Sequence, residues 1–324
     1  MEKTAASIDL GSYTARLLVA RLGEGQIIES VTRARIYVHL GDDPSLIRSG
    51  LLSNAAQRRA IDALKRLSHQ ALLVGAECTV AVATGVIRSA KNREQFINRI
   101  KKEVGLDVRL ISGVEEASLT AKGALQALRG LSPPLGVFDL GGGSTEFFFH
   151  QGTGSKQKLL SIPLGAAVLT KRFLRKDPPD SLELLALGEE IENRLENTLL
   201  PYKNEIIEGL SLVGTGGTVT SIAAMKQNLP ISEVRPENLN GTQINSSQIE
   251  EIFDRIKKLP FSDRAMLRGL DRNRAKVIIA GTLCVLLIMQ HLGVERLYVS
   301  LSDLLEGVLL DLLENPKVAK ETEI

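Results

Sequence analysis

Two stretches of the chain repeat one pattern, and this repeat limits the folds open to it. They read "SIDLGSYTARLLVA" from Ser7 and "VFDLGGGSTEFFFH" from Val137. Each is typical of a β-strand that ends in Asp-Leu-Gly, a short loop of small polar residues, and a second strand. The equivalent acids, Asp9 and Asp139, are 130 positions apart, a period too long for a solenoid. One supersecondary unit used twice predicts two related domains.

The segments around the repeats alternate between strand and helix patterns. Helices are predicted over residues 53–67, with Ser53 as N-cap, 92–104 and 113–129, and short strands over 78–84 and 107–112. Further helices are predicted over 181–197, 246–259 and 274–291. Such alternation predicts an α/β fold with sheets covered on both faces. We expect one domain over residues 1–118, a second over 119–304, and a C-terminal helix, 305–324, that packs back onto the first. The charged tail after Pro316 is expected to fray.

Charge and composition exclude several partners. Lys plus Arg (40) nearly balances Asp plus Glu (38), and there is no Trp and only 4% aromatic residues on which bases could stack. We therefore expect no nucleic acid. The longest apolar run, Val277 to Met289, is too short to span a bilayer, and the first residues do not resemble a signal peptide. Cys78 and Cys284 lie far apart in apolar surroundings, which suits buried thiols in a reducing compartment. We expect a cytoplasmic protein with no membrane partner.

Three glycine-rich segments suggest phosphate chemistry. Two follow the repeated aspartates, and the third, "VGTGGTVTSIAA", joins a strand to an apolar helical stretch. Glycines let backbone N–H groups approach phosphate oxygens, a helix N-terminus favours anions, and neighbouring hydroxyls add donors. An Asp at a strand end can hold Mg²⁺ or its waters. The predicted metal ligands are Asp9, Asp139 and Glu146. The predicted phosphate-binding residues of the three loops are Gly11, Ser12, Tyr13, Gly141, Gly142, Gly143, Ser144, Thr145, Gly214, Thr215, Gly216 and Gly217.

Six motifs in order resemble one known family. They are "ATGVIRSAKN", "ISGVEEA", "DLGGGSTE", "SIPLGA", "VGTGGTVTSIAA" and "RAKVIIAG", and they are similar to motifs of the exopolyphosphatase/guanosine pentaphosphate phosphohydrolase (Ppx/GppA) family, within the actin and sugar-kinase superfamily. The resemblance covers nearly the whole chain. It implies the short form, two actin-like (ribonuclease H-like) domains with an inter-domain cleft. It also implies Mg²⁺-assisted attack of water on a terminal phosphoryl group in that cleft.

The resemblance assigns two further residues. A glutamate of "ISGVEEA" is the family's general base. Because Ser112-x-x-Glu115 matches a capping box, Glu115 has a structural task, and Glu116 is the predicted base. Arg88 follows Thr84 at a strand end and resembles the family's phosphate-gripping arginine, whose planar fork can contact two oxygens. Thr84 and Arg88 therefore join the predicted phosphate-binding residues. A basic run is predicted to be a solvated loop face: Lys171, Arg172, Arg175 and Lys176.

Several positions depart from the family pattern and keep alternatives open. Tyr13 replaces an Asn in the first loop, Gly85 and Ser89 stand where Ser and Asp are usual, and the C-terminal motif reads "SLSDLLEG", with Leu301, Asp303 and Leu305 changed. The favoured function is an exopolyphosphatase, because few aromatics argue against a nucleotide. The alternatives are conversion of pppGpp to ppGpp, a non-catalytic polyphosphate or (p)ppGpp-binding regulator, and a kinase-like ATP user. A homodimer is a common outcome for such proteins.

Overall fold

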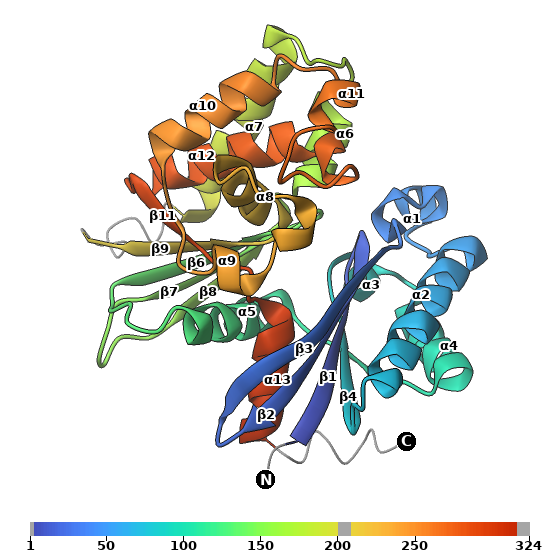
Figure 1. The fold of residues 1–324 in the computed structure, drawn as a ribbon. Coiled ribbons are helices and arrows are strands. Elements are labelled where there is room, and N and C mark those ends of the chain that lie inside the picture. The colour runs from blue at the N-terminus through green and yellow to red at the C-terminus, as the bar shows by residue number, and fades with distance from the viewer. Residues whose placement is uncertain (1–2, 200–208, 316–324) are drawn as a thin grey trace. The chain divides into compact units, whose positions relative to one another are not determined.

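The computed structural model describes residues 3–199 and 209–315. The chain divides into two compact units, Met1–Gly123 with Leu304–Ile324, and Ala124–Asp303. Each unit holds one sheet with helices packed on it, which confirms the predicted α/β class (Figure 1). The tail after Pro316, and with it the end of the predicted C-terminal helix, lies outside the described residues.

The first unit is built on a five-stranded sheet in the order β3-β2-β1-β4-β5. Strands β1 (Lys3–Leu10), β2 (Thr14–Gly23) and β3 (Gln26–Tyr37) form an antiparallel meander. Strands β4 (Cys78–Ala83) and β5 (Val108–Leu110) continue the sheet in parallel with β1. The helices are α1 (Pro44–Ser49), α2 (Asn54–Leu73), α3 (Gly85–Ser89), α4 (Arg93–Val104), α5 (Gly113–Ala127), which continues into the second unit, and α13 (Leu304–Glu314).

Both faces of this sheet are buried, as predicted. Helix α2 begins where the Ser53 hydroxyl accepts a hydrogen bond from the Ala56 N–H (3.2 Å), so Ser53 is the N-cap. Helices α2 and α4 share one apolar cluster with Ile8 and Leu17 of the sheet. On the other face α13 packs on Ala5 and Leu18, and the carbonyl of its Leu305 accepts a hydrogen bond from the Ser7 hydroxyl. Burial on both faces explains the nearly continuous apolar run of β4, which reads CTVAVA and is buried at all six residues.

The second unit repeats the first. Its sheet has the order β10-β11-β9-β6-β7-β8. Strands β6 (Leu135–Leu140), β7 (Thr145–His150) and β8 (Lys158–Ile162) form the antiparallel meander, and β9 (Ser211–Thr215) and β11 (Arg296–Val299) run parallel to β6. Without the edge strand β10 (Gln243–Asn245), this is the strand order of the first unit. The duplication predicted from the two Asp-Leu-Gly segments is confirmed.

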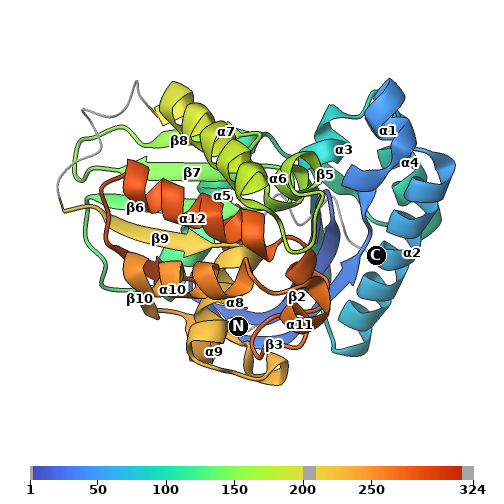
Figure 2. The same ribbon diagram turned by 90° about the horizontal axis from the view of Figure 1, so that it is seen from above.

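The helices of the second unit are α6 (Ala166–Phe173), α7 (Ser181–Leu199), α8 (Gly217–Lys226), α9 (Pro236–Leu239), α10 (Ser246–Ile256), α11 (Phe261–Arg264) and α12 (Ile278–His291). Helices α7, α10 and α12 lie on one face of the sheet (Figure 2). Several predicted helices have other bounds in the structure; α2 of the first unit, for example, ends at Leu73 and not at residue 67. Helix α10 stops at Ile256, three residues before the predicted end. Residues 274–276 form a 3₁₀ turn, and α12 starts after it.

Two structural observations concern the membrane and the cysteines. Within residues 3–199 and 209–315 no helix is long and apolar enough to cross a membrane. Cys78 and Cys284 are buried free thiols, as predicted. Burial raises the pKa of both thiols, which keeps them protonated and unreactive.

Candidate active site

The first glycine loop joins β1 to β2 and is tied to the end of β4. The Gly11 N–H donates to the Thr14 carbonyl (2.9 Å), and the Ser12 hydroxyl accepts from the Val86 N–H (3.1 Å). Gly85 has φ +49°, and a Cβ there would lie 2.3 Å from Ser12 Oγ. This contact explains glycine at a position where the family usually has serine. Ser12 and Thr84 thus border one loop cluster, and both are buried.

Asp9 lies at the base of this loop and pairs with Arg16 across the hairpin. The Arg16 Nε and Nη2 both donate to Asp9 Oδ2, at 2.9 and 2.8 Å. Asp9 is 4% exposed. Its charge is therefore balanced by a guanidinium within its own unit.

Arg88 and Glu116, the predicted phosphate-binding arginine and base, lie side by side. Arg88 is in α3 and Glu116 in the first turn of α5. Arg88 Nη1 is 3.1 Å from Glu116 Oε2 and donates to the Ile111 carbonyl (2.9 Å). Glu116 is 9% exposed. An arginine that can bind phosphate thus holds a largely buried carboxylate directly beside it.

The structure shows one half of the capping box that was predicted for Ser112 and Glu115. The Glu115 N–H donates to the Ser112 hydroxyl (3.1 Å) at the start of α5. Its carboxylate pairs with Arg109 of β5 (2.9 Å). Two adjacent glutamates therefore differ in setting. Glu115 lies half-buried in a structural ion pair, and Glu116 lies buried beside Arg88.

Tyr13 points its ring toward the segment after β3. A Cβ on Gly41 would lie 2.8 Å from Tyr13 Cζ, and the ring meets His39 edge-on at 6.3 Å between centroids. Burial, and secondarily the charge of Asp42, raise the pKa of Tyr13 to about 12. The Tyr13 phenol therefore stays protonated at any physiological pH.

This shift predicts an alkaline instability that Tyr13→Phe removes. The phenol ionises near pH 10 in the unfolded chain but near pH 12 in the folded one, so its contribution to stability is full below pH 10 and is lost as the pH rises toward 12. Between pH 9 and pH 11 the wild type should lose about 1.4 kcal/mol more unfolding free energy than Tyr13→Phe. Urea unfolding of both proteins at these pH values measures the difference. Equal losses would contradict the burial of the phenol.

The second glycine loop, between β6 and β7, rests on the start of α6. The Gly141 N–H donates to the Ser144 carbonyl (3.0 Å). The Gly141 and Gly142 carbonyls accept from the N–H groups of Ala166 and Ala167, both at 3.0 Å. A Cβ on Gly165 would lie 2.4 Å from Gly142 backbone atoms, so this approach requires glycine. Within the described part of the chain, the N–H groups of Gly142 and Gly143 donate to no atom. Donors of this kind suit a phosphate.

Asp139 and Glu146 face each other beside this loop. They are cross-strand partners in β6 and β7, so their side chains share one face of the sheet. Glu146 is 3% exposed, and its Oε1 accepts from the Ser161 hydroxyl (2.8 Å). On the other side Asp139 is in register with Thr215 of β9. Two carboxylates so placed favour a cation between them.

The buried threonines have different surroundings. Thr145 is fully buried, and its hydroxyl donates to the Leu164 carbonyl. This hydrogen bond ties the end of the second glycine loop to the segment before α6. Thr215 is also fully buried, but among the described residues its hydroxyl oxygen has no hydrogen-bond partner. A buried unpaired hydroxyl is costly unless a ligand or water completes it.

The glycines of the third loop have separate tasks. Gly214 lies in β9, where a Cβ would lie 2.9 Å from Phe138 Cζ. Gly216 has φ +88°, and a Cβ there would lie 2.5 Å from Asp139 Oδ1. A Cβ on Gly217, the first residue of α8, would lie 0.8 Å from Arg274 Nη1. Gly214 therefore serves packing, Gly216 makes the turn against Asp139, and Gly217 makes room for a guanidinium.

Arg274 lies at the third glycine loop, and sequence reasoning did not single it out. It begins the 3₁₀ turn before α12, and its guanidinium lies against Gly217 at the start of α8. The signal was present, since Arg274 opens the motif "RAKVIIAG". The sequence, however, shows no link between this arginine and a glycine loop far earlier in the chain.

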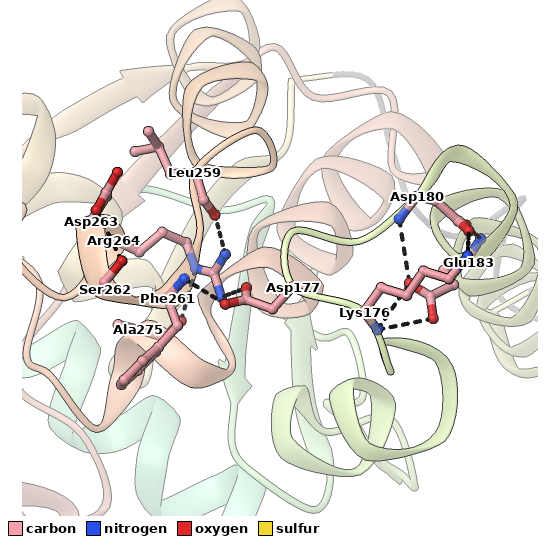
Figure 3. A network of polar contacts seen from close by, with 10 residues as sticks. All are labelled: Lys176, Asp177, Asp180, Glu183, Leu259, Phe261, Ser262, Asp263, Arg264 and Ala275. Carbon is pink, nitrogen blue, oxygen red and sulfur yellow. Dashed lines mark hydrogen bonds and ion pairs between the residues drawn. The ribbon is translucent and has the colours of Figure 1, made fainter.

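The basic run is exposed, as predicted, but Lys171 and Arg172 lie in the last turn of α6 and not in a loop. Arg172 pairs with Glu190 (2.9 Å) and Lys176 with Asp180 (2.6 Å). Figure 3 shows Lys176 beside Asp180 and Glu183. The Glu183 carboxylate also accepts a hydrogen bond from the backbone N–H of Lys176. Acidic residues at the start of α7 and along it thus offset part of the positive charge of the basic run.

The residues present fit Mg²⁺ bound through few protein ligands. The described residues contain no group of three or more acidic, histidine or cysteine side chains that could hold a metal ion. Magnesium is commonly held by one or two carboxylates, with waters and substrate phosphates completing its shell. Asp139 and Glu146 supply such a pair, with the unpaired Thr215 hydroxyl on a neighbouring strand.

Comparison with known proteins identifies the family. The model of the Ppx/GppA phosphatase family matches residues 18–316. The chain belongs to this family. Exopolyphosphatase 2 of Mycobacterium tuberculosis is 30% identical, over 95% of this chain and 98% of that protein. A bifunctional 3-dehydroquinate synthase/phosphatase of Fusobacterium nucleatum is 27% identical over 96% of this chain, which spans 46% of that protein. The crystal structure of the Aquifex aeolicus family member has a TM-score of 0.81 at 31% identity, over 98% of this chain and 99% of that one.

Membership in this family establishes the general class of the protein and its fold. The chain is a Ppx/GppA-type phosphatase with two actin-like α/β domains, as the resemblance of its motifs implied. The strand order common to the two units gives the structural basis of this fold.

Proposed function

We propose that this phosphatase is an exopolyphosphatase that hydrolyses terminal phosphate from inorganic polyphosphate with Mg²⁺. The observation that carries the proposal is the ion pair of Arg88 and Glu116 at 3.1 Å. This contact supports the proposal because a carboxylate can accept a proton and the arginine fork can contact phosphate oxygens. The relatives named exopolyphosphatase support the choice of substrate. The two buried free thiols support a cytoplasmic location as part of this proposal.

In this reaction Glu116 takes a proton from water as the water oxygen bonds to the terminal phosphorus. The bridging P–O bond breaks, and the shortened chain leaves with the bridging oxygen. In the first unit Arg88 is the proposed ligand of phosphate oxygens. In the second unit Arg274 and the N–H groups of Gly142 and Gly143 are the proposed donors to phosphate. Because the transition state of phosphoryl transfer is loose, positioning and charge supply most of the catalysis. Asp139 and Glu146 would hold Mg²⁺, with Asp9 as a further candidate in the first unit, and the bound ion would supply positive charge to the phosphate oxygens.

A second candidate is pppGpp, and one observation favours it. Tyr37 and His39 stack at 5.8 Å between ring centroids, and the His39 N–H donates to the Tyr13 carbonyl of the first loop (3.2 Å). The chain has few aromatic residues, yet three rings gather beside this loop. Aromatic rings are the surfaces on which nucleobases stack.

A side-by-side phosphate-release assay on polyphosphate, pppGpp and ATP tests the proposal. We expect the highest kcat/KM on polyphosphate, and loss of release when EDTA removes Mg²⁺. Highest kcat/KM on pppGpp would favour the second candidate, and turnover of ATP alone would indicate a kinase-like enzyme. Tight binding of polyphosphate or ppGpp without any release would make the protein a regulator.

A further inference from the structure

Arg264 is an arginine that the proposed reaction does not use, and it is almost completely buried. It ends α11 and is 4% exposed. Its Nε donates to the Ala275 carbonyl (3.2 Å), and its Nη1 donates to the Leu259 carbonyl. Its Nη2 is 2.8 Å from Asp177 Oδ1 (Figure 3). A buried guanidinium is stable only when its donors are satisfied, and here all three of its nitrogens have acceptors.

Asp177, the partner of Arg264 in this ion pair, belongs to another part of the chain. It lies in the connection between α6 and α7, and its second oxygen, Oδ2, accepts from the Phe261 N–H (2.6 Å). One carboxylate therefore binds both the first and the last residue of α11. Asp177 is exposed at the surface while Arg264 is buried beneath it, so the carboxylate closes the network from the solvent side.

The segment held in this way carries Arg274. Between Leu259 and Val277 only the four-residue α11 and a 3₁₀ turn are regular. Such a segment depends on side-chain contacts to keep its path. The Ala275 carbonyl that Arg264 binds belongs to the residue directly after Arg274. On the same segment, Gly269 rests against the backbone at Ala224 and Met225 of α8. The segment between Leu259 and Val277 thus contacts Asp177 and also helix α8. The first residue of α8, Gly217, lies against the Arg274 guanidinium.

We propose that Asp177 and Arg264 are positioning residues that hold the Arg274 guanidinium against Gly217, where it binds a phosphate group. The inference rests on the proposed function, since it assigns Arg274 to the phosphate site. The Asp177–Arg264 pair touches no phosphate. It fixes the backbone at Ala275, and through it the direction from which Arg274 enters the glycine loop.

The test compares wild type, Asp177→Asn, Arg274→Gln and the double variant. Asp177→Asn keeps the size of the side chain but removes its charge and one acceptor. Calorimetry measures the Kd of inorganic tripolyphosphate with EDTA present to stop turnover. We expect Arg274→Gln and Asp177→Asn each to weaken binding by roughly tenfold or more, the size of a lost hydrogen bond to a charged group. The double variant should bind within about twofold of Arg274→Gln, because both changes remove one interaction.

Asp180→Asn is the matched control. It makes the same substitution three residues along the same connection and breaks the exposed pair with Lys176. The Asn oxygen can still accept from the Glu183 N–H, as Asp180 Oδ1 does at 2.9 Å. The Kd of this variant should stay within about twofold of wild type, as expected for a surface pair. Hydrogen exchange of residues 259–277 should speed up in Asp177→Asn and stay unchanged in the control. If Asp177→Asn does not fold, Arg264→Lys, which keeps the charge but not the planar fork, takes its place.

Additive losses in the double variant would overturn the proposal, as would wild-type affinity in Asp177→Asn. Wild-type affinity in Arg274→Gln would overturn it too, by removing Arg274 from the phosphate site. Failure of the proposed hydrolysis gives a different result. Coupled losses in Kd without phosphate release from any substrate would leave the positioning role standing and end the exopolyphosphatase assignment.

Discussion

Glu116→Gln should lower the turnover of polyphosphate by about 10²–10⁴-fold, the usual worth of a positioned general base. Gln keeps the shape of the side chain and can still accept from Arg88, which lies 3.1 Å from Glu116. It cannot take a proton from water at neutral pH. The KM for polyphosphate should therefore change little while kcat falls. Steady-state phosphate release at saturating Mg²⁺ measures both constants.

Glu115→Gln is the control for this prediction, because it changes the adjacent residue in the same way. Glu115 pairs with Arg109 on the protein surface, and its N–H, which caps to Ser112, is unaffected by the change. We expect kcat within about twofold of wild type and a stability loss of at most about 1 kcal/mol. Loss of turnover in Glu115→Gln with normal turnover in Glu116→Gln would mean that the base is the other glutamate.

The repeated hairpins could be predicted from the sequence because their information is local. A strand pattern that ends in Asp-Leu-Gly, followed by a second strand, fixes the meander, and the recurrence of Asp9 as Asp139 fixes the number of units. The short helix α11 escaped prediction. Four residues carry no periodicity, and α11 is held by Arg264 and Asp177, which are distant in sequence.

In the candidate site, too, local features could be predicted from the sequence and contacts between distant residues could not. The sequence marks Gly214, Gly216 and Gly217 as one loop, but their separate tasks depend on Phe138, Asp139 and Arg274, which only the folded chain brings to them. Arg88 and Glu116 were each predicted from a family motif, and their direct contact was not. Motifs indicate which residues take part. Tertiary packing decides which of them touch.

The glycine positions also explain why a departure from the family pattern need not disrupt the first loop. Gly85 stands where the family usually has serine, and the Ser12 hydroxyl fills the space that a side chain would take. The hydroxyl is thereby fixed by the Val86 N–H beside the first loop. Glycine at residue 85 is therefore compatible with an ordered first loop.

Asp139→Asn should raise the Mg²⁺ concentration needed for half-maximal rate by at least about tenfold and lower kcat as well. Asp139 and Glu146 are cross-strand partners, and replacing one carboxylate by an amide leaves a single anionic ligand for the ion. A second readout does not need turnover. Mg²⁺ at 100 times its wild-type Kd should stabilise the wild type by about 2.7 kcal/mol and a tenfold weaker variant by about 1.4 kcal/mol. Thermal melting with and without Mg²⁺ measures this difference.

The control is Asp254→Asn, which removes an exposed carboxylate paired with Lys257 and should behave like wild type in both measurements. An unchanged Mg²⁺ requirement in Asp139→Asn would show that the ion is held elsewhere, with Asp9 the next carboxylate to test.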